Sequence, residues 1–395
     1  MQRPHLPRGV VALGFVSLFM DTSSEMVHSL LPVFLVSVLG ISAMSVGIIE
    51  GIAEATAAIV KVFSGTLSDW IGRRKPLVLL GYGLAALTKP LFPLASGLGL
   101  VLTARFVDRI GKGIRGAPRD ALVADITAPA SRGAAYGLRQ SMDTLGAVAG
   151  PCIALVLMVL SGDNFRLVFW VAVVPAVVSV LFIVWGVQEP ETLAVTHRRR
   201  SPIHRDELRR LPPAYWLVIA FATVLTLARF SEAFLLLRAS SVGLADTWVP
   251  LVLIVMNVVY AASAWPFGHW SDRIDRHRLL ALGIAFLVAA DVVLALASST
   301  GGVLAGTVLW GLHMGATQGL LTTLVADAAP ADLRGTAFGL FNLATGVTLL
   351  LASFLAGALW TAAGPATTFT AGAGFSLLAL CGLGAVRRRA GVVRS

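Results

Sequence analysis

The sequence LVAD at residues 122–125 is followed, after a short polar spacer, by RGAAYGL at residues 132–138. The same order recurs later in the chain as LVAD at residues 324–327 and RGTAFGL at residues 334–340, with the same spacing. A chain that repeats its landmarks at half of its length is built from two copies of one structural unit.

A second pair of stretches supports this two-copy architecture. GTLSD at residues 65–69 leads to Arg73, and GHWSD at residues 268–272 leads to Arg276, at nearly the same offset. In a membrane protein, two related halves indicate a transporter whose substrate site lies between them.

The composition indicates a membrane protein. Of the 395 residues, 56% are hydrophobic and only 13% are charged, whereas a soluble domain has about 25% charged residues. Apolar runs of about 20 residues recur along the whole chain, and each is long enough to cross a hydrocarbon core of about 30 Å. The sequence therefore predicts an all-α polytopic membrane protein.

The apolar runs predict twelve transmembrane helices in two pseudo-symmetric bundles of six. They cover residues 9–38, 45–67, 77–95, 98–123, 133–161, 166–187, 214–239, 247–268, 279–298, 302–328, 336–362 and 366–386. Residues 189–213 combine prolines and arginines without an apolar period, which is typical of a linker. We expect an N-terminal bundle at 1–188, a basic cytoplasmic linker at 189–213 and a C-terminal bundle at 214–395.

The net charge of +10 fits the positive-inside rule. Lys and Arg gather near the chain ends, in the linker and in alternate loops, so we expect both termini and the linker to be cytoplasmic. The same distribution predicts a protein of the cell inner membrane, surrounded by the lipid bilayer, with no nucleic-acid partner. Cys152 and Cys381 lie in apolar runs, and the sequence predicts no disulfide framework, metal site or cofactor.

The stretch GTLSDWIGRR at residues 65–74 resembles the cytoplasmic signature of the major facilitator superfamily, between predicted helices 2 and 3. Trp70 replaces a residue that is often basic in that family, and the second copy has Asp275 in place of Gly72. The resemblance covers the whole chain. It implies a transporter of a small-molecule substrate, not an enzyme, and we expect it to be a monomer.

Two weaker signatures agree with this resemblance. Arg105-Phe106 is similar to the buried arginine of the family's helix 4, and helix 5 is similar to the antiporter signature, which implies exchange of the substrate for protons. We expect the glycines of that signature to share one face and pack tightly, and the proline to bend the helix. The residues are Gly137, Gly146, Gly150 and Pro151. Residues 23–26 and 108–115 resemble an uncharacterised bacterial subgroup.

Placing an ionisable group inside a membrane costs free energy, so each such group is a candidate functional residue by default. Asp21, Glu25 and His28 follow one another at i, i+4 and i+7, on one face of helix 1. Glu54 in helix 2 and Glu232 in helix 7 are further intramembrane acids. We expect these four carboxyl groups to bind and release the coupling protons, and Glu25 is the first candidate because no adjacent base on its own helix holds it ionised.

Basic side chains inside the predicted helices indicate a substrate with a negative or chelating group. Three of them share one face of helix 4, and the others lie in helices 5 and 7. The predicted substrate-binding residues are Arg105, Arg109, Lys112, Arg139, Asp143 and Arg229.

An alternative interpretation makes the same charges fixed ion pairs between or along helices. The pairs would be Asp108 with Arg105 or Arg109, Arg139 with Asp143, and Glu54 with Lys61. Lys89, beside Pro90, could snorkel toward the membrane surface or face a cavity.

The signature between helices 2 and 3 predicts a gate at the cytoplasmic face. Asp69 can cap the N-terminus of a facing helix, and Arg73 can reach an acid at the end of helix 4, for which Asp125 is the candidate. We expect these contacts to hold one conformation closed to the cytoplasm. The predicted gating residues are Gly65, Asp69, Gly72, Arg73, Arg74 and Asp125.

The sequence thus predicts a secondary active transporter that works by alternating access and exports an anionic or chelating organic compound in exchange for protons. A symporter or uptake permease for an organic anion or a metal chelate is the first alternative. A polytopic membrane enzyme is the second, although the sequence has no nucleophile elbow, metal-ligand cluster or phosphate-binding loop.

Overall fold

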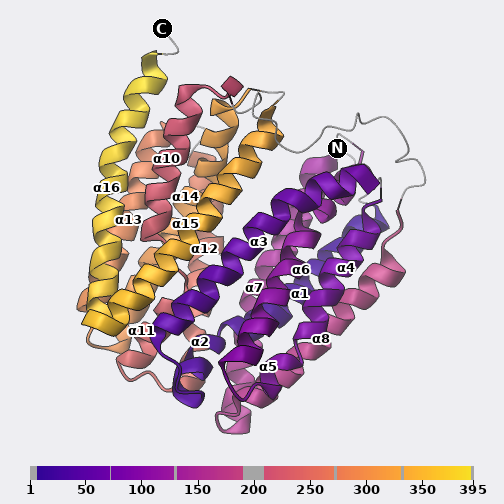
Figure 1. Ribbon diagram of the computed structural model, residues 1–395, viewed down its shortest axis with the longest axis vertical. Coiled ribbons are helices and arrows are strands. Elements are labelled where there is room, and N and C mark those ends of the chain that lie inside the picture. Colours follow the sequence, from indigo (N-terminus) through magenta and orange to yellow (C-terminus); the bar gives the residue numbers. More distant parts are fainter. Residues whose placement is uncertain are drawn as a thin grey trace. The chain divides into compact units, whose positions relative to one another are not determined.

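A computed structural model of the chain describes residues 7–71, 73–128, 131–189, 209–270, 274–330 and 333–392 (Figure 1). In these ranges the regular structure is helical and contains no strand. The chain forms two compact units. The N-terminal unit comprises Met1–Leu39 and Thr56–Pro202, and the C-terminal unit comprises Gly40–Ala55 and Ile203–Ser395.

The helices follow the order that the sequence predicts. The first half contains α1 (Arg8–His28), α2 (Leu31–Val33), the π-helix η1 (Phe34–Val38), α3 (Ala43–Ile71), α4 (Lys75–Thr88), α5 (Leu91–Leu94), α6 (Leu98–Asp125), α7 (Arg132–Ser161) and α8 (Phe165–Gly186). The second half contains α10 (Pro213–Ala228), α11 (Ala233–Ser241), the 3₁₀-helix η3 (Asp246–Trp248), α12 (Pro250–Trp270), α13 (Arg276–Leu296), α14 (Thr300–Ala328), α15 (Arg334–Ala363) and α16 (Pro365–Val392).

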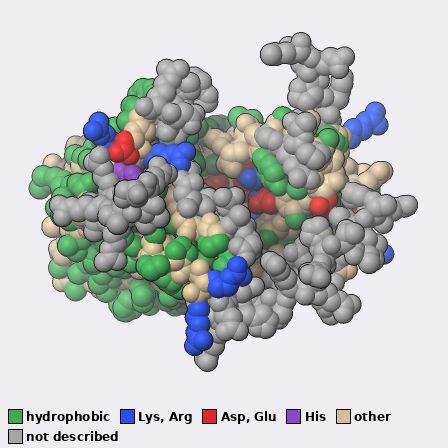
Figure 2. All heavy atoms as spheres, turned by 90° about the horizontal axis from the view of Figure 1, so that it is seen from above, with side chains coloured by type: hydrophobic (Ala, Val, Ile, Leu, Met, Phe, Trp, Pro, Cys, Tyr) green, Lys and Arg blue, Asp and Glu red, His purple; other side chains and the backbone are tan. Residues whose placement is uncertain are grey.

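Nine stretches of the described residues are long and apolar enough to cross a membrane. Three further helices, α3, α6 and α14, have 28 or 29 residues. Their length of about 42 Å is also sufficient to span a membrane. Hydrophobic side chains form broad areas of the surface, whereas charged ones occur in small separate groups (Figure 2). These observations confirm the all-α polytopic membrane fold.

Three predicted helices are not continuous, contrary to the sequence interpretation. The first breaks at Ser29 and Leu30 before α2, the third at Lys89 and Pro90 between α4 and α5, and the seventh at 229–232 between α10 and α11. Pro90 has no N–H to continue the α4 ladder. The break between α10 and α11 contains no proline. There the backbone of Arg229 leaves the helical region at φ −102° and ψ 59°.

The first part of α3 packs with the C-terminal unit, through glycines. A Cβ atom at Gly51 would lie 2.9 Å from Cδ1 of Leu350, and one at Gly357 would lie 2.8 Å from the carbonyl oxygen of Ala43. These contacts join α3 to α15 at backbone distance. The two units therefore divide the chain within the linker expected at 189–213 and also within α3.

In the N-terminal unit, α1 packs against α7 and α8, and α4 packs against α6. Glycines allow the closest of these approaches. A Cβ atom at Gly81 of α4 would lie 2.6 Å from the carbonyl oxygen of Gly111 in α6. Phe15, Phe19 and Phe182 stack with centroid distances of 5.5–6.3 Å and fill the interface between α1 and α8.

The helix-5 signature glycines do not all have the predicted role. Cβ atoms at Gly146 and Gly150 of α7 would lie 2.7 Å and 2.6 Å from carbonyl oxygens of α1, so both glycines allow close contact between these helices. Gly137, in contrast, is exposed and has open space around it. The prediction that it shares the tightly packed face was wrong, because Gly137 lies nine residues before Gly146 and an α-helix of 3.6 residues per turn places these two positions on opposite faces.

In each unit an arginine binds the carbonyl groups at the end of one helix. Arg166 of α8 donates to the carbonyl oxygens of Pro93 and Ala95, both at 3.0 Å. Arg238 of α11 donates to those of Leu294 at 2.9 Å and Ala297 at 2.5 Å. A cation at a helix C-terminus satisfies carbonyl groups that lack an intrahelical donor and interacts favourably with the helix dipole.

We expect Gly150→Ala to lower the thermal unfolding temperature of the purified protein, because the new methyl group would separate α7 from α1. Overpacking of this kind costs about 1–3 kcal/mol. Gly137→Ala is the matched control on the same helix, where alanine has room and stabilises a helix by up to about 1 kcal/mol relative to glycine. Equal unfolding temperatures for the two variants would contradict the packing assignment.

Candidate functional site

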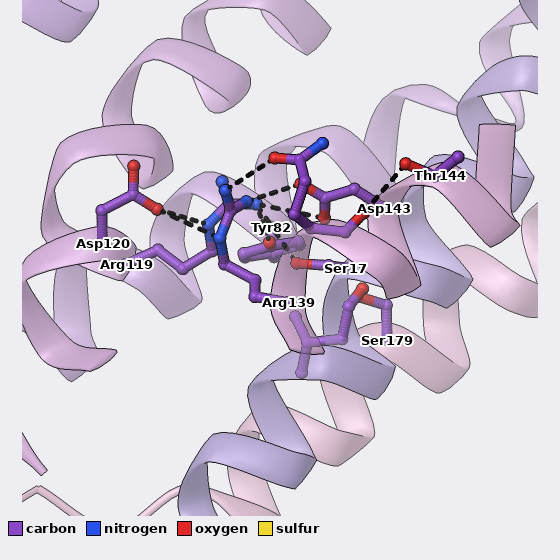
Figure 3. Close-up of polar contacts among 10 residues, drawn as sticks. Ser17, Tyr82, Arg119, Asp120, Arg139, Asp143, Thr144 and Ser179 are labelled. Carbon is purple, nitrogen blue, oxygen red and sulfur yellow. Dashed lines mark hydrogen bonds and ion pairs between the residues drawn. The ribbon is translucent and has the colours of Figure 1, made fainter. Parts of the chain in front are cut away.

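Four helices of the N-terminal unit contribute polar or charged side chains to one network. Arg119 of α6 lies at its centre (Figure 3). Its Nη1 donates to Oγ of Ser17 in α1 and to the hydroxyl of Tyr82 in α4, both at 3.2 Å, and its Nε donates to Oδ1 of Asp120 at 3.2 Å. One guanidinium group therefore connects α1, α4 and α6.

A second arginine extends the network to α7. Arg139 Nη1 forms an ion pair of 2.5 Å with Oδ2 of Asp143, and its Nε lies 3.7 Å from Oδ1 of Asp120. Arg119 Nη1 lies 4.0 Å from the other oxygen of Asp143. Asp120 and Asp143 lie on opposite sides of the two guanidinium groups (Figure 3). The predicted pair of Arg139 and Asp143 is thus formed, as part of a group of four charges.

Arg115 lies one turn of α6 before Arg119. Its guanidinium carbon is 4.4 Å from the centre of the Tyr82 ring, a cation–π contact. The side chain is buried, and its Nη1 has no hydrogen-bond acceptor among the described residues. Arg115 therefore has a hydrogen-bond donor to offer inside the unit.

A buried ion pair lies further along the same helices. Lys89, at the end of α4, lies 3.1 Å from Oδ1 of Asp108 in α6, and both side chains are at most 5% exposed. Lys89 also donates to Oγ of Ser24 in α1 at 3.1 Å. Lys89 therefore does not snorkel toward the membrane surface, because its ammonium group ends on a carboxylate inside the unit.

Asp108 was predicted to pair with arginines of its own helix. Arg105 and Arg109 are buried and close enough to act on the charge of Asp108 electrostatically, and Lys89 adds a contact from another helix. Asp108 therefore lies among several bases, and their attraction offsets the desolvation free energy of the buried carboxylate.

Glu25 has a partner on its own helix, contrary to the sequence interpretation. Its Oε2 lies 3.4 Å from Nδ1 of His28, one turn later in α1. Arg109 and Lys112 of α6 also act on its charge. The side chain of Glu25 remains 25% exposed and Lys112 is exposed, so this part of the cluster is accessible. Asp21, one turn before Glu25, lies within electrostatic range of Asp143 and Arg115.

The residues predicted to form a gate make a different basic contact from the one predicted. Arg74, not Arg73, reaches Asp125, with 3.3 Å between Nε and Oδ2. Arg74 also donates to Oγ of Ser68 near the end of α3. Arg73 is exposed, and α3 ends at Ile71. Gly72 and the side chain of Asp69 lie outside the described part of the chain.

Glu189 stabilises the same region from the start of the linker. Its Oε1 accepts hydrogen bonds from the backbone N–H groups of Arg74 and Lys75, which begin α4. A carboxylate at a helix N-terminus satisfies free N–H groups and interacts favourably with the helix dipole. Glu189 therefore fixes α4 to the end of α8, and sequence reasoning assigned it only to the linker.

The C-terminal unit holds a smaller polar group at the break between α10 and α11. Arg229 interacts electrostatically with Glu232 and Tyr260, and the Tyr260 hydroxyl donates to Oε1 of Gln318 at 3.0 Å. Discontinuous helices carry binding sites in many transporters. Glu54 is half-buried in the part of α3 that belongs to the C-terminal unit.

Among the described residues, no group of three or more His, Cys, Asp or Glu side chains could hold a metal ion. The structure instead brings basic and acidic groups of α1, α4, α6 and α7 together. Sequence reasoning did not assign Tyr82, Arg115, Arg119 or Asp120 to this site. The signal for the three charged residues was their position one turn apart or adjacent in a helix that already carried other charges.

Comparisons with known proteins identify the family. The sequence profile of the Major Facilitator Superfamily matches residues 13–346 and 233–392. The chain belongs to this superfamily. An uncharacterised transporter of the same type from Methanocaldococcus jannaschii is 31% identical over 94% of this chain and 93% of that protein. The resemblance seen in the sequence is thereby confirmed, as is the prediction that the protein is not an enzyme.

Other members of the superfamily are more distant. The multidrug resistance protein MdtH of Edwardsiella ictaluri is 24% identical over 85% of this chain and 80% of its own length. The crystal structure of the nucleoside transporter NupG superposes with a TM-score of 0.80 over 95% of this chain and 99% of that one, at 13% identity. At this identity the likeness concerns the fold, which has twelve helices in two bundles, as predicted.

We expect Arg74→Ala to increase backbone amide exchange around Ser68 and at the end of α6, because it removes the contacts with Ser68 and Asp125. Arg73→Ala is the matched control, since Arg73 is exposed and adjacent. Hydrogen–deuterium exchange of the two purified variants, followed by mass spectrometry, compares them peptide by peptide. A larger increase in Arg73→Ala than in Arg74→Ala would contradict the assignment of these contacts to Arg74.

Proposed function

We propose that this member of the major facilitator superfamily couples the movement of an anionic or chelating organic compound to protons, and that it exports that compound from the cytoplasm across the cell inner membrane. The observation that carries the proposal is the charge balance of the N-terminal unit. The charge cluster on α1, α4, α6 and α7 contains seven bases and five acids among the described residues, all buried or half-buried except the exposed Lys112. The bases are Lys89, Arg105, Arg109, Lys112, Arg115, Arg119 and Arg139, and the acids are Asp21, Glu25, Asp108, Asp120 and Asp143.

The surplus of bases favours a substrate with a negative group. Uncompensated charges in a membrane interior cost several kcal/mol, so an anion that completes the balance is stabilised there. The acids paired with Lys89 and Arg139 are already engaged. Arg109, Lys112 and Arg115 lie on successive turns of α6 between these two pairs and are the bases that we assign to the substrate.

Glu25 is the carboxyl group best placed to exchange protons with a substrate. It is partly exposed and lies among His28, Arg109 and Lys112. A Cβ atom at Gly150 of α7 would lie 2.7 Å from Cβ of Glu25, and one at Gly146 would lie 3.0 Å from Cβ of Asp21. A shift of α7 would therefore move both acids relative to the bases of α6, which is the change that alternating access requires.

The charge of the substrate decides the direction of coupling. A cationic part of the substrate that binds the Glu25 carboxylate replaces its proton, so substrate and proton exchange, as in an antiporter. A purely anionic substrate withdraws the bases from Glu25 and favours its protonation, so substrate and proton travel together. The antiporter-like glycines in contact with α1 and the relatives named as multidrug resistance proteins support export of a chelating or zwitterionic compound. The contacts of Glu25 with the bases favour symport as the second candidate.

We expect organic anions and chelates to raise the unfolding temperature of the purified protein, whereas matched neutral and cationic analogues do not, because a ligand stabilises the folded state by mass action. Arg109→Ala should weaken binding about 10- to 100-fold, the equivalent of one charge-assisted hydrogen bond of about 1.5–3 kcal/mol. Arg278→Ala, which removes an exposed charge from α13, should leave binding unchanged. Stabilisation by cationic analogues alone would refute the anion assignment.

Glu25→Gln should abolish the proton exchange that accompanies substrate binding while keeping the shape of the side chain. The measurement is the pH change in weakly buffered solution when the substrate found above is added to purified protein. Release of protons by the wild type indicates antiport, and uptake indicates symport. If Glu25→Gln protein exchanges as many protons as the wild type, Glu25 is not the coupling group.

A further inference from the structure

The two halves of the chain place opposite charges at matching positions. Lys89 and Asp291 are separated by as many residues as the repeated stretches that begin at Leu122 and Leu324. The same separation relates Gly81 to Gly283. Lys89 ends α4 and Asp291 lies near the end of α13, so the repeat puts a base in one unit where the other has an acid.

The surroundings of the two residues differ. Lys89 has the Asp108 carboxylate and the Ser24 hydroxyl as partners. Asp291 is completely buried, and the partner of its Oδ2 among the described residues is the Ser376 hydroxyl of α16 at 3.5 Å, the outer limit of a hydrogen bond. Its Oδ1 has no hydrogen-bond partner among the described residues. The base of the first unit is neutralised by an ion pair, and the acid of the second unit is not.

The close contact of α16 leaves no room for another group beside Asp291. A Cβ atom at Gly372 would lie 2.9 Å from Oδ2 and 3.1 Å from Oδ1 of the carboxyl group. The absence of a side chain at Gly372 lets the backbone of α16 cover the carboxyl group. This contact seals Asp291 between two helices that pack closely along the C-terminal unit.

Among the described side chains of the packed helices, no cation faces Asp291. In α14 the described titratable group is His313, whose Nδ1 contacts the carbonyl oxygen of Gly283, two turns earlier in α13. In α16 it is Cys381, which is exposed. Arg238 of α11 is engaged with the carbonyl groups at the end of α13. An ionised Asp291 would therefore be an uncompensated charge, which an apolar interior strongly disfavours.

We propose that Asp291 is a second proton-binding site, in the C-terminal unit, which holds a proton in the conformation seen here and releases it in another state of the transport cycle. In that step the O–H bond of the carboxyl group breaks, the proton passes to water and the carboxylate remains. This role rests on the proposed proton-coupled transport. The site would give each repeat its own proton-binding carboxyl group, with Glu25 in the first half and Asp291 in the second.

The bound proton is tested without a substrate. The infrared spectrum of purified wild-type protein near neutral pH should contain a C=O stretching band of a protonated carboxylic acid that is missing in Asp291→Asn. The control is Asp163→Asn, at an exposed position whose φ of 65° asparagine tolerates. A spectrum in which Asp291→Asn leaves every such band in place would overturn the proposal.

Stability against pH gives a second readout. The folded wild type keeps a proton that the unfolded chain releases, so its unfolding equilibrium constant should rise by up to tenfold per pH unit as pH increases above the range in which a free aspartate titrates. This contribution should be missing in Asp291→Asn and unchanged in Asp163→Asn. Parallel pH profiles for the wild type and Asp291→Asn would contradict the bound proton.

Release of the proton during transport is tested in proteoliposomes with an imposed pH difference. Asp291→Asn should lose pH-driven accumulation of the substrate and keep exchange without a gradient. If it retains full accumulation, Asp291 does not release its proton in the cycle and the proposal fails. If the wild type itself ignores the pH difference, the proposed proton coupling fails, whereas the infrared comparison still decides whether Asp291 holds a proton.

Discussion

A charge inside a membrane-spanning bundle requires a partner, and this requirement organises the N-terminal unit. Lys89 meets Asp108, and Arg119 and Arg139 lie between Asp120 and Asp143. Each contact either connects two helices or connects residues that themselves contact another helix. Because removing one member leaves the other as an uncompensated charge, the helices α1, α4, α6 and α7 are held together by polar contacts as well as by apolar packing.

Close backbone approach makes these polar contacts possible. Gly81 and Gly111 allow α4 and α6 to touch at their backbones, so that Tyr82 lies against Arg115 and Lys89 reaches Asp108. Gly146 and Gly150 bring α7 equally close to α1 at Asp21 and Glu25. A bulkier residue at such a position would separate two helices and thereby lengthen several ion pairs at once. Packing and electrostatics in this unit are therefore not independent contributions to stability.

The two halves of the chain share a backbone plan and differ in how they use it. Both have a helix that is broken inside the apolar span. In both, an arginine donates hydrogen bonds to carbonyl groups at the end of a helix, at α5 in the first half and at α13 in the second. Arg166 comes from α8 and Arg238 from α11. The charges themselves have diverged. The first half concentrates bases in α6, whereas α14, its counterpart, is largely uncharged. Among the described residues of the second half, the buried acid is Asp291.

The sequence by itself determined the fold class, the two-copy architecture, the approximate helix ranges and the helices that carry charge. These properties depend on local features, namely the length of apolar runs, the spacing of repeated stretches and the residue types within a run. It also identified Glu25, Arg139 and Asp143 as notable, because charges in apolar helices are rare. The superfamily signature at residues 65–74 was sufficient to predict the family.

The tertiary structure alone decided which groups meet. Arg73 and Arg74 are neighbours in sequence, yet Arg74 contacts Asp125 whereas Arg73 is exposed. Lys89 finds Asp108, and Gly137 loses the role that Gly146 and Gly150 keep, because contact depends on the depth and rotation of two helices relative to each other. The sequence of one helix contains no information on which helix lies beside it at a given depth. The partner of a buried charge depends on that neighbouring helix.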